Sequence, residues 1–385
     1  MAELALLASF EGSGIVIANG NEFSCNEGES LFLFRKGSEP LDWESSDNNV
    51  AQVKDGVVFA KNEGSCTILA KYGKKVDFYK IKIGTAKRIK NAAYLNNDGD
   101  LKIFAITSED IEDLELRNNG KSWKILSKNS FRNGENLFWE LNVSTDSLVV
   151  GNFNFEILPT KSGNLKKEDA YVLTGNFFSK DNLENEDYSF GKNISKKGVE
   201  LIMEWEGFVP SLSEDRLVPG VYNIGNGDVI NFGETFYNNI TKEQAFVDLI
   251  NKLNTRKYVK DINRFLKENK IKCTQQQFDA LVSFSYNLGT RWIEKSGLKD
   301  VLLDSFEPGT SARNLSFVNV ERLIKEVLIW HHILVEGKKI CILGLLYRRI
   351  SELDLFLHKE YNKESGKLNR YNYTISKCIK EKVKT

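Results

Sequence analysis

The chain has 385 residues, and its 53 basic and 53 acidic side chains give it a formal net charge of zero. This length exceeds that of one compact domain and predicts two or three domains. Balanced charge produces no overall field that would favour nucleic acid or an anionic membrane, so neither is expected as a partner.

The N-terminal segment lacks the features of an export signal. It has no basic n-region, and its short apolar run is interrupted by Glu11 and Gly12, so we expect no signal peptide. Apolar runs such as residues 31–34 and 340–346 are short core segments that cannot cross a bilayer, and we predict no membrane span.

The residues that most often bind metals show no metal-ligand spacing. The histidines do not form a zinc motif, and the cysteines are scattered along the chain, so we expect no metal and no organic cofactor. We interpret the cysteines as buried free thiols, with a bridge between the first two as the alternative. They are Cys25, Cys66, Cys273, Cys341 and Cys378.

The first 84 residues are predicted to form a β-sandwich. Alternating apolar runs at 56–60, 66–71 and 76–83 are separated by clusters of Asn, Asp and Gly. Asp55-Gly56 is a hairpin signal, because glycine accepts the positive φ that this turn requires. The segment 43–73, with its Trp43-x-Ser-Ser opening and its Gly64-x-Cys66-Thr-Ile strand, resembles bacterial immunoglobulin-like domains of the second type.

Residues 85–159 are predicted to form a second β-sandwich, with strands at 101–106, 123–126, 137–143 and 153–158. This stretch resembles no particular family, and carrier or adaptor work is the default expectation for such a module. The polar stretch 160–193 is predicted to be a linker. A short strand at residues 171–173 within it is the alternative.

Helical signals begin at Ser195, which is placed to cap a first helix. Thr241-x-x-Gln244 and Thr274-x-x-Gln277 are capping boxes, and further helices are predicted near 311–316, 320–333 and 345–357. A strand-and-turn patch at 222–236 completes an α+β domain over 194–361, with a small β lobe, a helical lobe and a cleft between them. The basic tail 362–385 is expected to be a solvated terminus, with contact to an anionic wall polymer or a partner protein as the alternative.

Glycosidic hydrolysis requires an acid that protonates the leaving oxygen and a second polar group that positions water or stabilises positive charge. Glu206 is the candidate acid, because it ends an apolar helix beside Trp205 and is followed by the helix breaker Gly207. Asp215 lies on the loop that follows. A Glu at a helix end is usually only a solvated carboxylate, so these two residues alone are a weak signal.

The surrounding motifs resemble those of phage-type lysozymes. That family carries Glu-Gly at the end of a first helix, then an Asp or Cys, then a hairpin reading roughly Tyr-Thr-Ile-Gly-x-Gly-His. Here Glu206-Gly207 is followed by Asp215 after eight intervening residues, and the stretch 222–228, Tyr-Asn-Ile-Gly-Asn-Gly-Asp, occupies the hairpin's place. The resemblance continues in order through 240–245, 277–289, Ser296-x-Leu298, Trp330, Gly337 and the ending 344–352.

This resemblance implies a set of functional residues. Glu206 would be the general acid, Asp215 would stabilise charge or assist water, and Asn223 would orient the attacking water. Substrate binding is expected from five residues in or near the family's glycan groove: Asp228, Val229, Tyr286, Asn287 and Ser296. For Tyr286 and Asn287 a core position is the alternative.

Two departures bear on activity. Asn223 replaces the family's Thr in a hairpin preceded by two extra residues, and Asp228 replaces its His. Asn223 keeps a donor and an acceptor, so the water-orienting role survives with altered geometry. Asp228 needs a new partner if its role is structural; the alternative is a second carboxylate in the cleft. Arg348, Arg349 and Glu352 are predicted to form ion pairs on one helix face.

We therefore predict a muramidase that cleaves the β-1,4 bond between N-acetylmuramic acid and N-acetylglucosamine of bacterial peptidoglycan. Two β modules without an export signal suggest that a phage particle or injection device carries the enzyme to the cell wall, with phage structural or tail proteins as partners of the modules. The main alternative is an inactive lysozyme fold that serves as a structural or glycan-binding part of a virion. Action on another amino-sugar polymer, such as chitin, is a third possibility.

Overall fold

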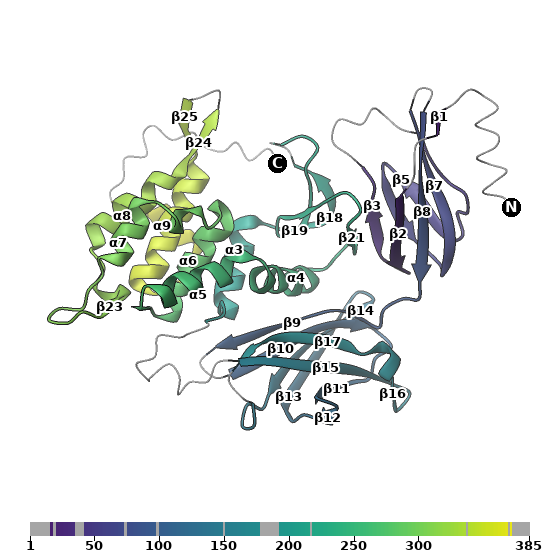
Figure 1. Ribbon diagram of the computed structural model, residues 1–385, viewed down its shortest axis with the longest axis horizontal. Coiled ribbons are helices and arrows are strands. Elements are labelled where there is room, and N and C mark those ends of the chain that lie inside the picture. The colour runs from purple at the N-terminus through teal and green to yellow at the C-terminus, as the bar shows by residue number, and fades with distance from the viewer. Residues whose placement is uncertain are drawn as a thin grey trace.

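The computed structural model describes residues 16–17, 21–34, 42–72, 75–97, 100–148, 151–177, 192–215, 218–335, 338–368 and 370–371. Two β-sandwich modules precede a mainly helical domain, and each module lies against that domain (Figure 1). The predicted fold class is confirmed, and the all-β first module agrees with the immunoglobulin-like resemblance.

The first module is built from two sheets. One has the order β1-β8-β7-β4, with β2 also pairing with β8, and the other contains β3, β6 and β5. The core between them is formed by side chains from both sheets, including Leu31, Val58, Ile68 and Ile81. The strands are β1 (Val16–Ile17), β2 (Asn21–Asn26), β3 (Ser30–Phe32), β4 (Asp42–Ser45), β5 (Ala51–Lys54), β6 (Val57–Ala60), β7 (Gly64–Tyr72) and β8 (Lys75–Gly84).

The predicted turn at Asp55-Gly56 joins β5 to β6. Lys54 pairs with Val57, and both turn residues have positive φ, 50° and 77°. A Cβ on Gly56 would lie 2.9 Å from the Cβ of Phe34, so glycine is also required by close packing.

The second module is a sandwich of the sheets β13-β14-β10-β9 and β12-β11-β15-β16, with β17 added to β15. β17 extends the strand proposed at 171–173, so the predicted linker starts later than residue 160. The strands are β9 (Ile89–Asn97), β10 (Asp100–Ser108), β11 (Asp113–Asn118), β12 (Lys121–Ser122), β13 (Ile125–Asn133), β14 (Asn136–Val143), β15 (Gly151–Lys161), β16 (Asn164–Leu165) and β17 (Tyr171–Phe177).

The C-terminal domain contains a three-stranded β lobe and a helical lobe. The β lobe consists of β18 (Val209–Glu214), β19 (Tyr222–Gly225) and β20 (Asp228–Ile230), and β21 (Thr235–Phe236) follows it. The helices are α3 (Lys196–Glu206), α4 (Lys242–Thr255), α5 (Lys257–Glu268), α6 (Gln275–Leu288), α7 (Gly297–Leu303), α8 (Val320–Leu328) and α9 (Leu343–His358). Short strands β22 (Ile271–Lys272), β23 (Arg313–Asn314), β24 (His332–Val335) and β25 (Lys338–Cys341) connect them, with 3-10 turns at 291–293, 315–317, 329–331 and 363–368.

Local signals placed the main helices correctly. Ser195 caps α3 by accepting from the amide of Gly198, and both predicted capping boxes form, at Thr241 and Thr274. The helix expected near 311–316 is instead a short strand and a 3-10 turn. The helix expected over 320–333 ends at Leu328, because the chain turns there into the β24–β25 hairpin.

Both β modules contact the C-terminal domain. Along β9 and β10 successive side chains point to opposite faces. One face fills the sandwich, and the other, with Leu95 and Phe104, packs against α4 in the core of the helical domain (Figure 1). In the first module β3 pairs with β21, and Phe232 lies beside Phe23 and Tyr79, with ring centroids 5.8 and 6.0 Å apart.

The described part of the predicted basic tail packs on the domain. The turn at 363–368 lies against α9, where Gly366 approaches the backbone of Tyr347, and Arg370 forms an ion pair with Glu360 at 2.9 Å. The domain thus extends beyond the boundary predicted at residue 361. Residues 372–385 lie outside the described residues.

The cysteine prediction is only partly correct. Cys25, Cys66 and Cys273 are free, and the considered bridge between the first two does not form. Cys341 is disulfide-bonded, contrary to the prediction of a free thiol. Cys378 lies outside the described residues.

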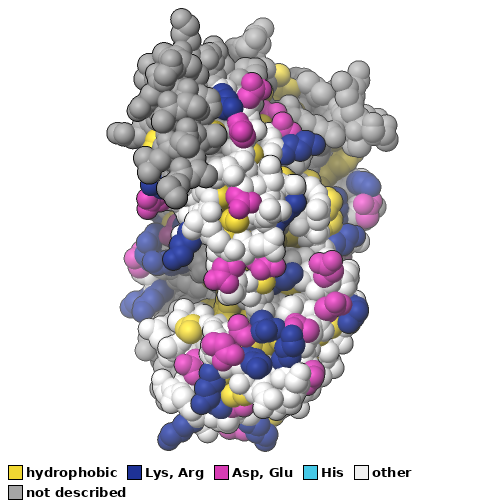
Figure 2. Space-filling model, turned by 90° about the vertical axis from the view of Figure 1, so that its right-hand side faces the viewer, with side chains coloured by type: hydrophobic (Ala, Val, Ile, Leu, Met, Phe, Trp, Pro, Cys, Tyr) yellow, Lys and Arg dark blue, Asp and Glu magenta, His cyan; other side chains and the backbone are white. Residues whose placement is uncertain are grey.

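Within the described residues, no helix is long and apolar enough to span a bilayer. On the face seen in Figure 2 acidic and basic side chains are interspersed, and neither sign dominates. This agrees with the balanced composition.

Candidate active site

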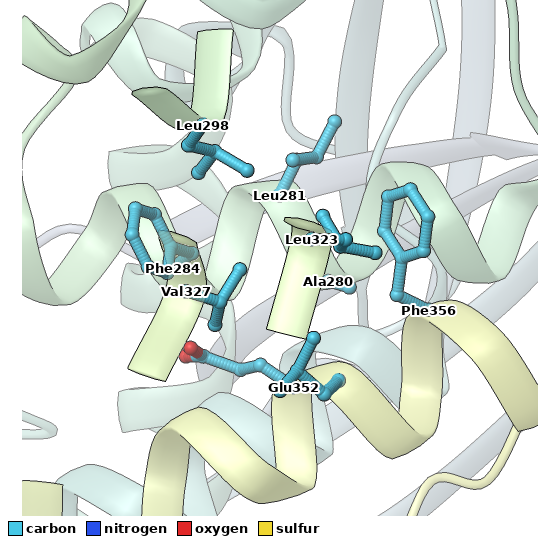
Figure 3. A pocket seen from close by; sticks show the side chains of 9 residues that line it. Ala280, Leu281, Phe284, Leu298, Leu323, Val327, Glu352 and Phe356 are labelled. Atoms are coloured by element: carbon cyan, nitrogen blue, oxygen red, sulfur yellow. The ribbon is translucent and has the colours of Figure 1, made fainter. Parts of the chain in front are cut away.

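The helical lobe contains a small apolar cavity that is not a substrate site. Its volume is about 20 Å³, and its walls are core side chains of α6, α7, α8 and α9, with Glu352 as the one charged residue among those lining it (Figure 3). This space holds about one water molecule, far less than a sugar ring needs. The candidate acid Glu206 lies elsewhere, at the end of α3 beside the β lobe.

Glu206 is the last residue of α3. Gly207, with φ of 75°, ends the helix as predicted, and its amide donates to the carbonyl of Met203 at 3.0 Å. The Oε1 atom of Glu206 accepts a hydrogen bond from Nη1 of Arg348 at 2.6 Å. The Glu206 side chain is 21% exposed and that of Arg348 only 4%, so one side of the carboxylate is held by a buried cation while solvent still reaches the group.

Arg348 connects the acid to the helical core. Its Nε contacts Glu352 at 3.2 Å and its Nη2 donates to the carbonyl of Ser283 at 3.3 Å. Burial alone would lower the pKa of Arg348, but the carboxylates of Glu206 and Glu352 raise it above its ordinary value. The predicted pairing of Arg348 and Arg349 with Glu352 is present. Interpreting Arg348 as only structural was incomplete, because it also binds the candidate acid.

Asp215 and Asn223 belong to the β lobe. The backbone of Asp215 donates to the carbonyl of Val221, and its Oδ1 accepts from the amide of Val218 at 2.9 Å. Asn223 lies in the middle strand, paired with Ser213 on β18 and Val229 on β20. Its half-buried amide forms no side-chain hydrogen bond with any described residue, so its donor and acceptor are available to a water molecule.

Asp228, the residue in place of the family's His, has acquired new partners. Its Oδ1 lies 3.0 Å from Nζ of Lys252 and 3.5 Å from Nη2 of Arg256. The Lys252 side chain is 8% exposed and also donates to the carbonyl of Gly227 at 3.0 Å. Of the two readings left open by the sequence, the geometry favours a structural ion pair that joins the hairpin to α4.

The remaining predicted substrate contacts lie in several places. Val229 is exposed on β20. Tyr286 of α6 donates from its hydroxyl to the carbonyl of Asn226 at 2.9 Å, and burial together with the charge of Glu206 raises its pKa. Asn287 is half-buried, and its Oδ1 has no partner among the described residues. Ser296 caps α7 and donates to the carbonyl of Trp292 at 2.8 Å, so its hydroxyl already has protein partners. Their roles toward substrate stay predictions.

Sequence reasoning missed three residues of the site. Arg348 contacts the acid, Lys252 contacts the hairpin turn, and Asn226 bonds the backbone of Gly207 beside the acid. Their partners are distant along the chain. Only Lys252 left a signal, because a lysine on the buried face of a predicted amphipathic helix requires a partner. None of the described residues form a cluster suited to a metal ion.

Comparison with known proteins agrees with this arrangement. The phage lysozyme family model matches residues 203–352. An endolysin of Bacillus phage B103 is 29% identical over 180 residues, which are 46% of this chain. The match spans 59% of that relative's length, less than two thirds. An endolysin of Acyrthosiphon pisum secondary endosymbiont phage 1 is 27% identical over 43% of this chain and 97% of its own length.

Among solved structures, the endolysin from Escherichia coli O157:H7 phage FAHEc1 is 28% identical, covering 45% of this chain and 99% of its own, with a TM-score of 0.38. The range matched by the family model includes Glu206, Asp215 and the hairpin at 222–228. Residues 203–352 thus form a domain that matches the phage lysozyme family.

Proposed function

We propose that the protein is a peptidoglycan hydrolase, a muramidase that cleaves the β-1,4 bond between N-acetylmuramic acid and N-acetylglucosamine. The observation that carries this proposal is Glu206, held by Arg348 at 2.6 Å at the junction of α3 and the β lobe. The phage lysozyme match and the two relatives named endolysin support the same chemical class.

The residues divide the reaction between them. Glu206 donates its proton to the glycosidic oxygen, and the carboxylate that remains is stabilised by Arg348. Asp215 stabilises the positive charge that develops on the sugar, and Asn223 orients the water that attacks it. Arg348 occupies Oε1, which leaves Oε2 for the substrate.

The test is Glu206→Gln in the full chain. The amide is nearly isosteric and its oxygen can still accept from Arg348, but the buried guanidinium loses one of its two carboxylate partners, so we expect the fold to persist with a loss of stability of about 1 to 3 kcal/mol. The rate of lysis should fall by ~10²- to 10⁴-fold, because general-acid catalysis is lost. Glu200→Gln, on an exposed position of the same helix, is the matched control and should retain activity.

Product analysis separates the alternatives. Mass spectrometry of digested peptidoglycan should find N-acetylmuramic acid at the new reducing ends. Cleavage of chitin alone would assign another polymer. No cleavage of either by the folded wild-type protein would favour the inactive particle component, which is motivated by Asn223 and Asp228.

We further propose that the β modules attach the enzyme to a phage particle. The support is architectural: β13 is an edge strand of the second module and exposes the apolar side chains Leu126 and Phe131. Mass spectrometry of purified particles should detect the full chain. Its presence only in the soluble fraction of a lysate would contradict virion attachment.

A further inference from the structure

A buried amide joins the turn of the active-site hairpin to the end of α3. Asn226 lies between β19 and β20 and is 5% exposed. Its Nδ2 donates a hydrogen bond to the backbone oxygen of Gly207. Because Gly207 directly follows Glu206, this bond ties the hairpin to the residue next to the candidate acid.

Two further elements hold the same turn. Tyr286 of α6 donates from its hydroxyl to the carbonyl of Asn226 at 2.9 Å. Lys252 of α4 donates to the carbonyl of Gly227 at 3.0 Å. The two turn residues therefore form hydrogen bonds with the end of α3, with α4 and with α6, which are far apart in the sequence.

Packing behind this turn is incomplete. A cavity of about 20 Å³ lies behind it, with Asn226, Lys252 and Tyr286 among its lining residues. A space of that size admits one water, so side chains leave the back of the turn unfilled. On its front, a Cβ at Gly227, whose φ is 77°, would lie 3.5 Å from Oε2 of Glu206. The turn backbone is thus adjacent to the second carboxyl oxygen of the acid.

We propose that Asn226 is a positioning residue that, together with Tyr286 and Lys252, holds the hairpin turn against Oε2 of Glu206. The proposal rests on the muramidase function proposed above. Arg348 holds Oε1 and the turn lies on the side of Oε2, so the carboxyl group keeps one orientation toward the glycosidic oxygen. Misplacement of a reacting group by about 1 Å can cost ~10² in rate.

This role predicts a specific kinetic effect. Asn226 is buried and offers almost no surface to a sugar, so its loss should lower kcat and leave KM nearly unchanged. Asn226→Ala is expected to fold, because the lost hydrogen bond is offset by removing a buried Oδ1 that has no partner among the described residues.

The experiment compares three variants of the full chain: Asn226→Ala, Tyr286→Phe and the control Asn263→Ala. Asn263 exchanges two hydrogen bonds with the backbone of Lys192, at 2.9 and 2.8 Å, and joins elements outside the hairpin. Release of reducing ends from soluble peptidoglycan fragments gives kcat and KM, corrected for the folded fraction by circular dichroism. Hydrogen–deuterium exchange reports on residues 222–230.

We expect Asn226→Ala to lower kcat by ~10 to 100-fold with KM within about twofold. Exchange should rise in the hairpin of this variant but stay unchanged there in Asn263→Ala. Tyr286→Phe should lower kcat less, and the double variant should lose less than the product of the two, since both bonds fix one turn.

The proposal would be overturned if folded Asn226→Ala kept the wild-type kcat. It would also be overturned if Asn263→Ala lost as much kcat as Asn226→Ala. If Asn226→Ala does not fold, unchanged kcat and unchanged exchange in Tyr286→Phe overturn it. A wild-type protein that cleaves no peptidoglycan refutes the proposed function instead; exchange in the hairpin of the variants then decides whether Asn226 holds the turn.

Discussion

Replacing Lys252 with Met removes the cation that lies 3.0 Å from Asp228 and 5.1 Å from the ring centroid of Tyr286, while keeping an unbranched apolar side chain in the buried position. A hydrogen bond between charged groups contributes about 1.5 to 3 kcal/mol. Asp228 is 31% exposed and has Arg256 as a second cation at 3.5 Å. Solvent and Arg256 therefore compensate for part of the free energy that is lost with Lys252. We expect a coupling free energy of about 1 to 2 kcal/mol between Lys252 and Asp228.

The assay is a double-mutant cycle of urea unfolding with Lys252→Met, Asp228→Asn and the double variant. Lys242→Met, at an exposed position of the same helix, controls for loss of a lysine. A coupling below about 0.5 kcal/mol would refute the ion pair as a structural link. Activity separates the two roles of Asp228: if it were a catalytic carboxylate, Asp228→Asn would lose lysis by ~10² or more without a loss of stability.

Three further predictions concern the interfaces and the hairpin. Phe232→Ala should destabilise the docked first module by about 1 to 3 kcal/mol, since the half-buried ring packs on Phe23 and Tyr79; an unchanged unfolding curve would contradict this docking. Burial raises the pKa of Asp248 to about 7, so its folded state retains a proton that the unfolded chain releases near pH 4. As the pH rises from about 4 to 7, the free energy of unfolding should therefore fall by on the order of 1 kcal/mol per pH unit. Asp248→Asn should remove most of this pH dependence when urea unfolding is measured across the same range. Asn223→Thr should keep or raise lysis in a zymogram and Asn223→Ala should lower it; equal activity of all three proteins would exclude a role in orienting water.

Features that depend on neighbouring residues were predictable from the sequence. Ser195 caps α3 because its hydroxyl lies three residues from the amide of Gly198, and Asp55-Gly56 turns the chain because both residues tolerate positive φ. The end of α3 at Glu206 follows from Gly207. The order of motifs from Glu206 to Glu352 then indicated the lysozyme domain before any contact was known.

Features that depend on which distant surfaces meet required the tertiary structure. The second apolar face of β9 and β10 is indistinguishable in sequence from an ordinary core strand until α4 is seen against it. The pairing of β3 with β21 uses backbone groups that every residue has, so the side-chain pattern of the sequence does not predict it.

The site shows the same division. The sequence by itself determined the helix end that presents Glu206 and the hairpin that carries Asn223, because both are local. Only the tertiary structure brought Arg348 to Glu206 across 142 residues of chain and Lys252 to Asp228. An ion pair forms where geometry brings two charges within about 4 Å in a partly buried place, and spacing along the sequence fixes that distance only within one helix or hairpin.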